Sequence, residues 1–240
     1  MKIVITQPMY FPWYGMLEQL NLADVLVYYD DVQFSKGGFT NRVQIKSNTN
    51  NGISWLTVPV AKPKSGTYIK EIMIGTDSSW KNEHLRSFSN NYSEAPYFLD
   101  AFALLKETCE INSESLNEII IHSMESVRNY LGIETENTIR SSDLDICGRS
   151  SQRVFDIVKY FGCDTYITGH GAINYLDHEL FEKNNISVEY LDYSKNVYPQ
   201  QLGDFNPYVS SLDLIANVGQ QGFRHLNSKT TYWRDFIKAN

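Results

Sequence analysis

The pattern of apolar and polar residues predicts buried strands near both ends of the chain, with amphipathic helices between them. The strands are expected at residues 2–6, 25–29, 164–168 and 186–191, where apolar residues follow one another with little alternation. The first two flank a short helix at residues 14–22, so they form a βαβ unit with parallel strands and a right-handed crossover. The pattern therefore predicts an α/β fold, with a mostly parallel sheet and helices on both of its faces.

The middle of the chain carries two different patterns. Residues 39–74 hold short β-type runs broken by turn-forming residues, so we expect an antiparallel β insertion there. Residues 79–132 repeat apolar residues at helical spacing and form a central helical segment, in which Gly132 ends the clearest helix. No internal repeat or linker interrupts the sequence, which predicts a single α/β domain over residues 1–240. The runs of the insertion are residues 40–45, 55–60 and 68–74, and the predicted breaks are Asn50-Asn51-Gly52 and Pro63-Lys64-Ser65-Gly66.

The charge balance argues against one large class of function. With 21 Lys and Arg against 28 Asp and Glu, the net charge is −7 at pH 7, and no run of basic residues occurs. General nucleic-acid binding needs a basic surface and is not expected. No stretch resembles a signal peptide or a membrane span, and Cys109, Cys147 and Cys163 fit neither a disulfide framework nor a metal-binding spacing. We therefore expect a cytoplasmic protein without membrane association and assign no metal site.

The loop after the first strand is the first candidate binding segment. In open α/β sheets, ligands bind beyond the carboxyl ends of the strands, which is where this loop lies. It reads QPMYFPWYG at residues 7–15, with two prolines and four aromatic residues. Tyrosine and tryptophan combine an apolar ring with a hydrogen-bonding group, which suits the wall of a pocket for a polar, ring-shaped ligand. Gln7, Tyr10 and Trp13 are the candidate contacts, and a purely structural role for the loop is the alternative.

Two adjacent carboxylates, Asp30 and Asp31, end the second strand. Neighbouring residues of an extended chain point to opposite faces, so only one of the two carboxylates can face the cleft. That carboxylate is a candidate catalytic base, and Gln33 beyond it is a candidate ligand contact. A turn acid that caps a loop is the alternative.

A third segment predicts an anion site. Residues 147–153 read CGRSSQR and lead into a helix. Amide groups at a helix N-terminus bind phosphate together with hydroxyl groups, and arginine supplies positive charge. The candidates are Arg149, Ser150, Ser151 and Arg153, and a helix cap without a ligand is the alternative.

The fourth segment reads GHGAINYL at residues 169–176, after another predicted strand. Gly169 and Gly171 flank His170 and allow the backbone to approach a ligand closely. His170 is a candidate general base, with a structural role as the alternative, and Tyr175 is a candidate contact. The sequence contains no Walker A, GxGxxG, HExxH or GxSxG motif. We expect the four segments to converge on one pocket suited to a sugar or a nucleotide.

Several long motifs resemble those of the WbqC-like protein family, over about nine-tenths of the chain. The opening TQPMYFPWYG at residues 6–15 is the most specific of them. The chain departs from the family's pattern at Gly169-His170, where Gly-Pro is usual, and at Gln152, where an acidic residue is common. The other matching segments are Ala23-Asp24, residues 29–34, Asn41-Arg42, Ile45-Lys46, residues 55–60, Asn91-Tyr92, residues 96–98, residues 198–200, residues 212–214 and residues 217–219.

This resemblance implies a role in the biosynthesis of bacterial surface polysaccharides such as the O-antigen of lipopolysaccharide. The implied activity is transfer of a glycyl or other acyl group to the amino group of a nucleotide-linked amino sugar. The expected partners are therefore a nucleotide-sugar substrate and an acyl or aminoacyl donor. Arg42, within the matching segments, is a further candidate substrate contact. The resemblance assigns neither a cofactor nor an oligomeric state.

Two other interpretations stay open. The segment FPWYGM at residues 11–16 occupies the place of the HxGH motif of certain nucleotidyltransferases, although Trp13 and Met16 stand where the two histidines would be. Such an enzyme would use a nucleoside triphosphate with Mg²⁺. The lack of an established catalytic motif also permits a non-catalytic protein that binds a sugar nucleotide.

Overall fold

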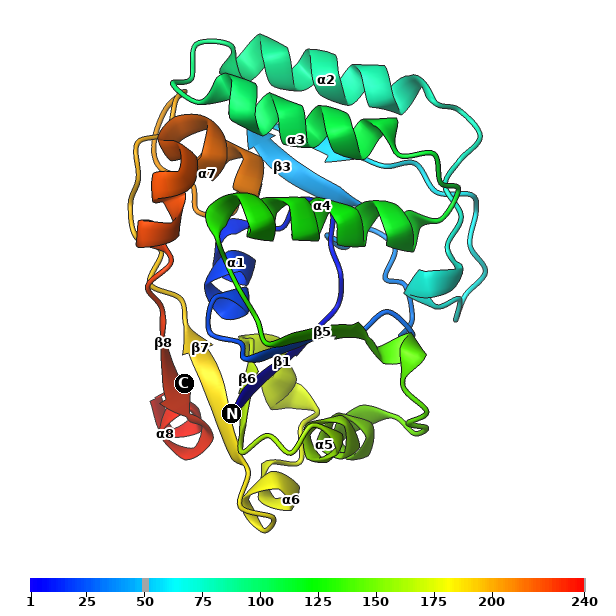
Figure 1. Ribbon diagram of the computed structural model, residues 1–240, viewed down its shortest axis with the longest axis vertical. Helices are drawn as coiled ribbons and strands as arrows, with labels where there is room; N and C mark the ends of the chain where they lie inside the picture. Colours follow the sequence, from blue (N-terminus) through cyan, green and yellow to red (C-terminus); the bar gives the residue numbers. More distant parts are fainter. Residues whose placement is uncertain (49–51, 240) are drawn as a thin grey trace.

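One six-stranded sheet organises the fold (Figure 1). The computed structural model describes residues 1–48 and 52–239. The strands of the sheet are β1 (Lys2–Thr6), β2 (Val25–Tyr28), β5 (Asn137–Arg140), β6 (Thr165–Thr168), β7 (Ser187–Asp192) and β8 (Lys229–Tyr232). Their order across the sheet is β5-β2-β1-β6-β7-β8. All neighbouring pairs are parallel except β7 and β8, which pair antiparallel.

The four strands predicted from the sequence are the four central strands of this sheet. β1 pairs in parallel with β2 on one side and with β6 on the other, and β6 pairs in parallel with β7. The predicted α/β class with a mostly parallel sheet is therefore confirmed. The two edge strands were not predicted, because β5 (NTIR) and β8 (KTTY) are polar and only partly buried. Neither has the continuous apolar run that marks a strand buried on both faces.

Helices cover both faces of the sheet, as predicted (Figure 1). Alternate residues of β1 enter opposite cores, since Val4 packs in one and Ile3 with Ile5 in the other. The helices are α1 (Tyr14–Leu20), α2 (Ser79–Tyr92), α3 (Phe98–Glu110), α4 (Leu116–Leu131), α5 (Ser150–Tyr160), α6 (His178–Glu182), α7 (Ser211–Val218) and α8 (Trp233–Ala239). The first core contains residues of α1 to α4 and α7, and the second contains residues of α5, α6 and α8.

The predicted antiparallel insertion contains one hairpin, formed by β3 (Arg42–Lys46) and β4 (Ile53–Thr57). The third strand expected at residues 68–74 is wrong, because a short 3-10 helix, η1 (Ile69–Glu71), occupies its centre. The Glu71 carboxylate accepts the Tyr68 backbone N–H at 3.0 Å and closes this turn. The predicted break at Asn50-Asn51-Gly52 lies partly outside the described residues, since only Gly52 is among them.

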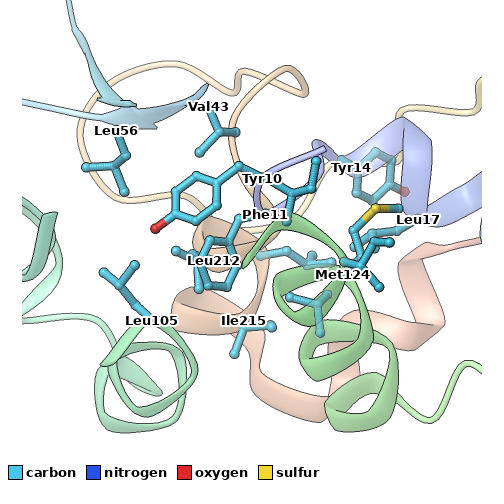
Figure 2. Packing of buried hydrophobic residues seen from close by; sticks show 14 of the residues in the cluster. Tyr10, Phe11, Tyr14, Leu17, Val43, Leu56, Leu105, Met124, Leu212 and Ile215 are labelled. Atoms are coloured by element: carbon cyan, nitrogen blue, oxygen red, sulfur yellow. The ribbon is translucent and has the colours of Figure 1, made fainter. Parts of the chain in front are cut away.

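The aromatic loop after β1 belongs largely to the first core. Tyr10 and Phe11 are fully buried, and Figure 2 shows them among side chains of the hairpin, α1, α3, α4 and α7. The Tyr10 hydroxyl lies 3.0 Å from Nδ1 of His84, whose Nε2 lies 3.1 Å from the Thr57 carbonyl oxygen. Because a carbonyl oxygen only accepts, Nε2 of His84 donates and the Tyr10 hydroxyl donates to Nδ1. Among the described residues, none of the helices has the length and apolar character needed to cross a membrane.

Candidate functional site

A cleft of about 900 Å³ opens where β1, β2 and β6 end. Gln7 follows β1, Asp31 follows β2 and His170 follows β6, and all three line the cleft. The start of α5 lines it as well, so the structure brings together the four segments that the sequence predicted to converge. The predicted site residues that line the cleft are Gln7, Asp31, Gln33, Arg149, Ser150, Arg153, Gly169, His170, Gly171 and Tyr175.

The two adjacent carboxylates separate as their positions on an extended chain require. Asp31 lines the cleft, whereas Asp30 is completely buried beside it. Oδ2 of Asp30 accepts the side-chain N–H of Asn117 at 2.7 Å and the hydroxyl of Ser142 at 2.9 Å, and Oδ1 accepts the Ser142 backbone N–H at 3.0 Å. Asp30 thus joins α4 to the turn after β5. Its carboxylate is thus engaged inside the protein, and of the two adjacent carboxylates it is Asp31 that lines the cleft.

Asp31 is held by Arg153, from the first turns of α5. Nη1 of Arg153 donates to Oδ1 of Asp31 at 2.9 Å, and Nη2 donates to Oδ2, so the pair is bidentate. Nε of Arg153 donates to the Ile146 carbonyl oxygen at 3.0 Å, and the guanidinium lies 5.2 Å from the ring centre of Tyr29. Burial acts to raise the pKa of Asp31, but hydrogen bonds from Arg153 and Ser141 outweigh it and the pKa is lowered. A carboxylate with a lowered pKa is a weak proton acceptor.

Arg149 supplies the positive charge that Arg153 does not. It is exposed, it lines the cleft directly before α5, and no described residue forms an ion pair with it. The neighbouring backbone is strained, because Ser150 has a φ of +54°, in the left-handed region that disfavours residues with a side chain. Gly148 has a φ of +114°, which only glycine adopts readily. This backbone places Gly148, Arg149 and Ser150 along the rim of the cleft.

His170 is exposed in the cleft and has one ring nitrogen engaged. Nε2 lies 2.8 Å from the Leu191 carbonyl oxygen, which can only accept, so Nε2 carries the proton. The lone pair of a neutral ring is then on Nδ1. The ring packs between Tyr193, at 5.0 Å between ring centres, and Phe236, at 4.7 Å. His170 is therefore oriented like a general base whose second nitrogen is anchored.

Tyr193 is a cleft residue that the sequence did not single out. A Cβ at Gly169 would lie 2.9 Å from its hydroxyl oxygen, so that hydroxyl reaches over the glycine at the end of β6. Burial raises the pKa of Tyr193 to about 12, so the hydroxyl keeps its proton at neutral pH and can donate it to a ligand. The ring of Trp13 packs against the ring of Tyr193, with ring centres 5.2 Å apart. The sequence could have pointed to Tyr193 through its position, because it comes just after the last predicted parallel strand.

Several predicted contacts lie elsewhere. Tyr10 is buried against His84, and Trp13 contacts Tyr193 and Tyr208 without lining the cleft. Arg42 is on the hairpin, where its guanidinium lies 4.3 Å from the ring centre of Trp55 and its Nε donates to the Gly38 carbonyl oxygen. The Ser151 hydroxyl likewise forms its hydrogen bonds within the protein.

The Ser151 hydroxyl ties α5 to the segment after β6. It donates to the Tyr175 carbonyl oxygen at 2.9 Å and accepts the Asp177 backbone N–H at 2.8 Å. Both contacts fix the loop that carries His170 and Tyr175. The hydroxyl is thus a positioning group, and Ser150 is left as the hydroxyl that faces the cleft from this segment.

The cleft is an electropositive site on an acidic protein. Among the described residues lining it, Asp31 is the acid and Arg149 with Arg153 are the permanently charged bases, so one positive charge is in excess. Within residues 1–48 and 52–239, no group of three or more His, Cys, Asp and Glu side chains could hold a metal ion. The arrangement can bind an anion at Arg149, stack or hydrogen-bond a ring against tyrosines, and accept a proton at His170.

Comparison with known proteins agrees with the resemblance in the opening motif. The WbqC-like protein family matches residues 7–225. The uncharacterized protein Rv1507c of Mycobacterium tuberculosis (strain ATCC 25618 / H37Rv) is 34% identical over 227 residues, which cover 92% of this chain and 95% of that protein. No solved structure shows a significant match. The match to nearly the whole chain shows that this protein belongs to the WbqC-like protein family.

Proposed function

We propose that the protein is an enzyme of bacterial surface-polysaccharide biosynthesis that acts on a nucleotide-linked amino sugar. In this proposal the cleft binds the nucleotide sugar and transfers a glycyl or other acyl group to the amino group of the sugar. The observation that carries it is the excess positive charge at Arg149, in the same cleft as an anchored histidine whose Nδ1 is a proton acceptor.

The phosphates of the ligand are assigned to Arg149. Arg153 already shares its charge with Asp31 and lies mostly out of solvent, whereas Arg149 is exposed on the rim. The hydroxyl of Ser150 and the amide groups at the start of α5 lie beside it. A charge-assisted hydrogen bond to phosphate contributes about 1.5–3 kcal/mol.

The rings of the ligand are assigned to the tyrosine side chains of the cleft. Tyr29, Tyr68, Tyr175 and Tyr193 line it, and Tyr68 and Tyr175 are exposed. An aromatic face packs against a nucleobase or against the apolar face of a sugar, while the hydroxyl groups bond to polar atoms at the edge. Gln7 and Gln33, both exposed at the cleft, add amide donors and acceptors.

His170 is assigned as the general base. The amine nitrogen of the sugar attacks the carbonyl carbon of the acyl donor, and Nδ1 of His170 takes the proton that the amine loses. The Tyr193 hydroxyl donates to the oxygen of the tetrahedral intermediate. When the intermediate collapses, the bond to the leaving group breaks, and His170 returns the proton to that group. The family usually has proline at this position, and proline has no basic side chain. The assignment of the base therefore concerns this chain and not the family as a whole.

A product assay of the His170→Gln variant tests the proposal. Glutamine keeps a side-chain N–H that can donate to the Leu191 carbonyl oxygen, but it lacks a basic nitrogen in place of Nδ1. With a UDP-linked amino sugar and a glycyl or acetyl thioester, we expect turnover to fall about 100-fold or more while the affinity for the nucleotide sugar is kept. Mass spectrometry of the N-acylated product measures turnover.

The matched control is His122→Gln on α4, whose ring contacts Thr108 and Glu107 away from the cleft. This control should retain wild-type turnover. If the wild-type protein binds the nucleotide sugar but forms no product with any acyl donor, the catalytic part of the proposal fails and a binding protein is left. If His170→Gln retains full turnover, the base is another group.

A further inference from the structure

A second groove, of about 750 Å³, runs between the hairpin and α2, separate from the cleft. One wall is the outer edge of β4, and the other is a polar stripe of α2. None of its lining residues lines the cleft. The described residues lining this groove are Ser47, Asn48, Ser54, Trp55, Leu56, Thr57, Glu83, His84, Arg86, Ser87, Asn90 and Asn91.

The pairing of the hairpin determines which backbone groups face the groove. In an antiparallel pair, opposed residues alternate between those that bond to each other and those whose N–H and C=O groups point outward. The Gln44 carbonyl oxygen accepts the Ser210 N–H at 2.8 Å, so Gln44 points away from β4. Trp55 is opposite Gln44, and its N–H and C=O therefore point away from β3, into the groove.

Two further contacts agree with this alternation. The Lys46 N–H donates to the Tyr92 hydroxyl at 2.9 Å, which also points it away from β4. The Thr57 carbonyl oxygen lies 3.1 Å from Nε2 of His84, on the groove side. Among the described residues, no partner satisfies the Trp55 N–H, the Trp55 carbonyl oxygen or the Thr57 N–H. The wall of the groove formed by β4 is thus an open strand edge.

The side chains around this edge are of the kind that binds protein segments. Glu83 and Arg86 are exposed on α2, one helical turn apart and with opposite charge. On the outer face of the hairpin, Phe39 and Trp55 are 45% and 38% exposed, and Arg42 stacks on Trp55. Arginine and aromatic side chains are enriched at the energetic centres of protein interfaces.

We propose that this groove binds an extended peptide segment of a partner protein, which adds to β4 as a third strand of the hairpin sheet. The peptide backbone pairs with the N–H and C=O groups of Trp55 and with the Thr57 N–H. An acidic peptide residue lies beside Arg86, and a basic one lies beside Glu83. The proposal goes beyond the proposed function, because it needs neither the cleft nor its chemistry.

Hydrogen exchange of the wild-type protein provides the test. In the free protein, the Trp55 amide should exchange faster than the amides of Ser54 and Leu56, which face β3 by the same alternation. Peptides selected on the immobilised protein from a random decapeptide library should slow exchange of the Trp55 amide at least tenfold. Selection that yields no peptide with this effect overturns the proposal, as does protection of Trp55 by neutral oligosaccharides instead of peptides.

Two variants at one position separate the backbone from the side chain. Trp55→Pro removes the N–H that faces the groove without removing a bond to β3, and Trp55→Thr keeps that N–H but loses the ring. We expect the proline variant to bind the selected peptides at least tenfold more weakly than the threonine variant, with far-UV circular dichroism confirming that both are folded. Equal affinity of the two variants contradicts strand addition.

A charge reversal on the opposite wall provides a further check. Arg86→Glu places two acidic residues on the α2 wall. It should weaken the binding of peptides that carry an acidic residue at that place by about tenfold. Arg224→Glu, an exposed arginine outside the groove, is the matched control and should bind as the wild type does. If both reversals have the same effect, binding is not in the groove.

Discussion

Two tyrosine-rich polar clusters, each built around a carboxylate, show opposite degrees of hydrogen-bond satisfaction. In the first core, Asp213 is completely buried and accepts the Tyr92 hydroxyl at 2.7 Å and the Tyr198 hydroxyl at 2.8 Å. Gln200 adds an amide donor at 2.9 Å. Burial raises the pKa of Asp213 to about 6, against the opposing effect of these donors. Both oxygens of the Asp213 carboxylate therefore accept hydrogen bonds from within the protein.

The cleft also combines a carboxylate with tyrosines, but several of its polar groups lack a partner among the described residues. Asp31 is paired, but Arg149, Nδ1 of His170 and the Tyr193 hydroxyl face a space that a ligand can fill. Buried polar groups that are fully bonded hold a fold together, while oriented groups left open to a cleft are available to a ligand. Both clusters contain motif residues of the WbqC-like family, so a motif alone does not distinguish the two roles.

Removing the buried carboxylate should produce the largest change in stability. Asp213→Ala leaves two tyrosine hydroxyls without their acceptor, each at a cost of about 1–3 kcal/mol, while the Gln200 amide keeps the Asn206 carbonyl oxygen as an acceptor. We expect the free energy of unfolding in urea to fall by about 3 kcal/mol or more. Asp213→Asn keeps one acceptor oxygen and should lose clearly less. If the free energy of unfolding of Asp213→Ala were the same as that of the wild type, the cluster around Asp213 would not stabilise the fold.

The two arginines of the cleft should divide between stability and binding. Arg149→Ala should lower the affinity for a nucleotide-linked ligand by about ten- to a hundredfold, with little change in the free energy of unfolding. Arg153→Ala leaves Asp31 half-buried without its partner and should destabilise the fold by about 2 kcal/mol. Calorimetric titration and urea unfolding measure the two effects. Lys159→Ala, at the exposed far end of α5, is the control.

The buried histidine of the first core should make stability depend on pH. Burial lowers the pKa of His84 from 6.5 to about 4. Between these values, the unfolded chain binds a proton that the folded protein excludes, so the stability that the neutral ring contributes is lost as pH falls. The stability difference between wild type and His84→Gln should shrink by about 2 kcal/mol from pH 7 to pH 5.

Comparing these two proteins at each pH cancels the opposite contribution of Asp213. Its raised pKa gives stability that is present at low pH and is lost as pH rises through about 6. Urea unfolding at three or more pH values provides the measurement. A difference that is constant with pH would mean that His84 titrates equally in both states.

The smallest expected effect on the fold comes from the glycine under Tyr193. Gly169→Ala places a methyl group 2.9 Å from the tyrosine hydroxyl oxygen, which has to move away from residue 169. We expect about a tenfold loss of turnover with less than about 1 kcal/mol of lost stability. Gly171→Ala, where no atom lies within 4 Å of the added methyl, is the matched control. Equal turnover of the two variants would remove Tyr193 from the site.

The central strands were predictable from sequence because burial on both faces leaves an unmistakable apolar run. The edge strands β5 and β8 were not, since one exposed side allows polar residues such as those of NTIR and KTTY. Residues 68–74 alternate like a strand, yet Glu71 closes a local turn there. Local side-chain bonds of this kind compete with strand pairing and are hard to weigh without the tertiary contacts.

For the site, the sequence located the four segments but not the use of each side chain. The rule that strand ends meet at one edge placed Gln7, Asp31, Arg149 and His170 in a common cleft. Whether a polar side chain is free depends on distant partners, as Tyr10 shows with His84 and Ser151 with Asp177. Tyr193 was missed because its contacts with Trp13 and Gly169 join segments that are far apart in the sequence.

The most direct test of the account is thermal or chemical stabilisation by nucleotide-linked amino sugars, measured on the wild type and on Arg149→Ala. At 100 times its Kd, a ligand of the cleft should stabilise the wild-type protein by about 2.7 kcal/mol. The same concentration should stabilise Arg149→Ala by much less, because its Kd is ten- to a hundredfold higher. Stabilisation of both proteins to the same extent, or of neither by any member of a panel of nucleotide sugars, would contradict the assignment of the cleft.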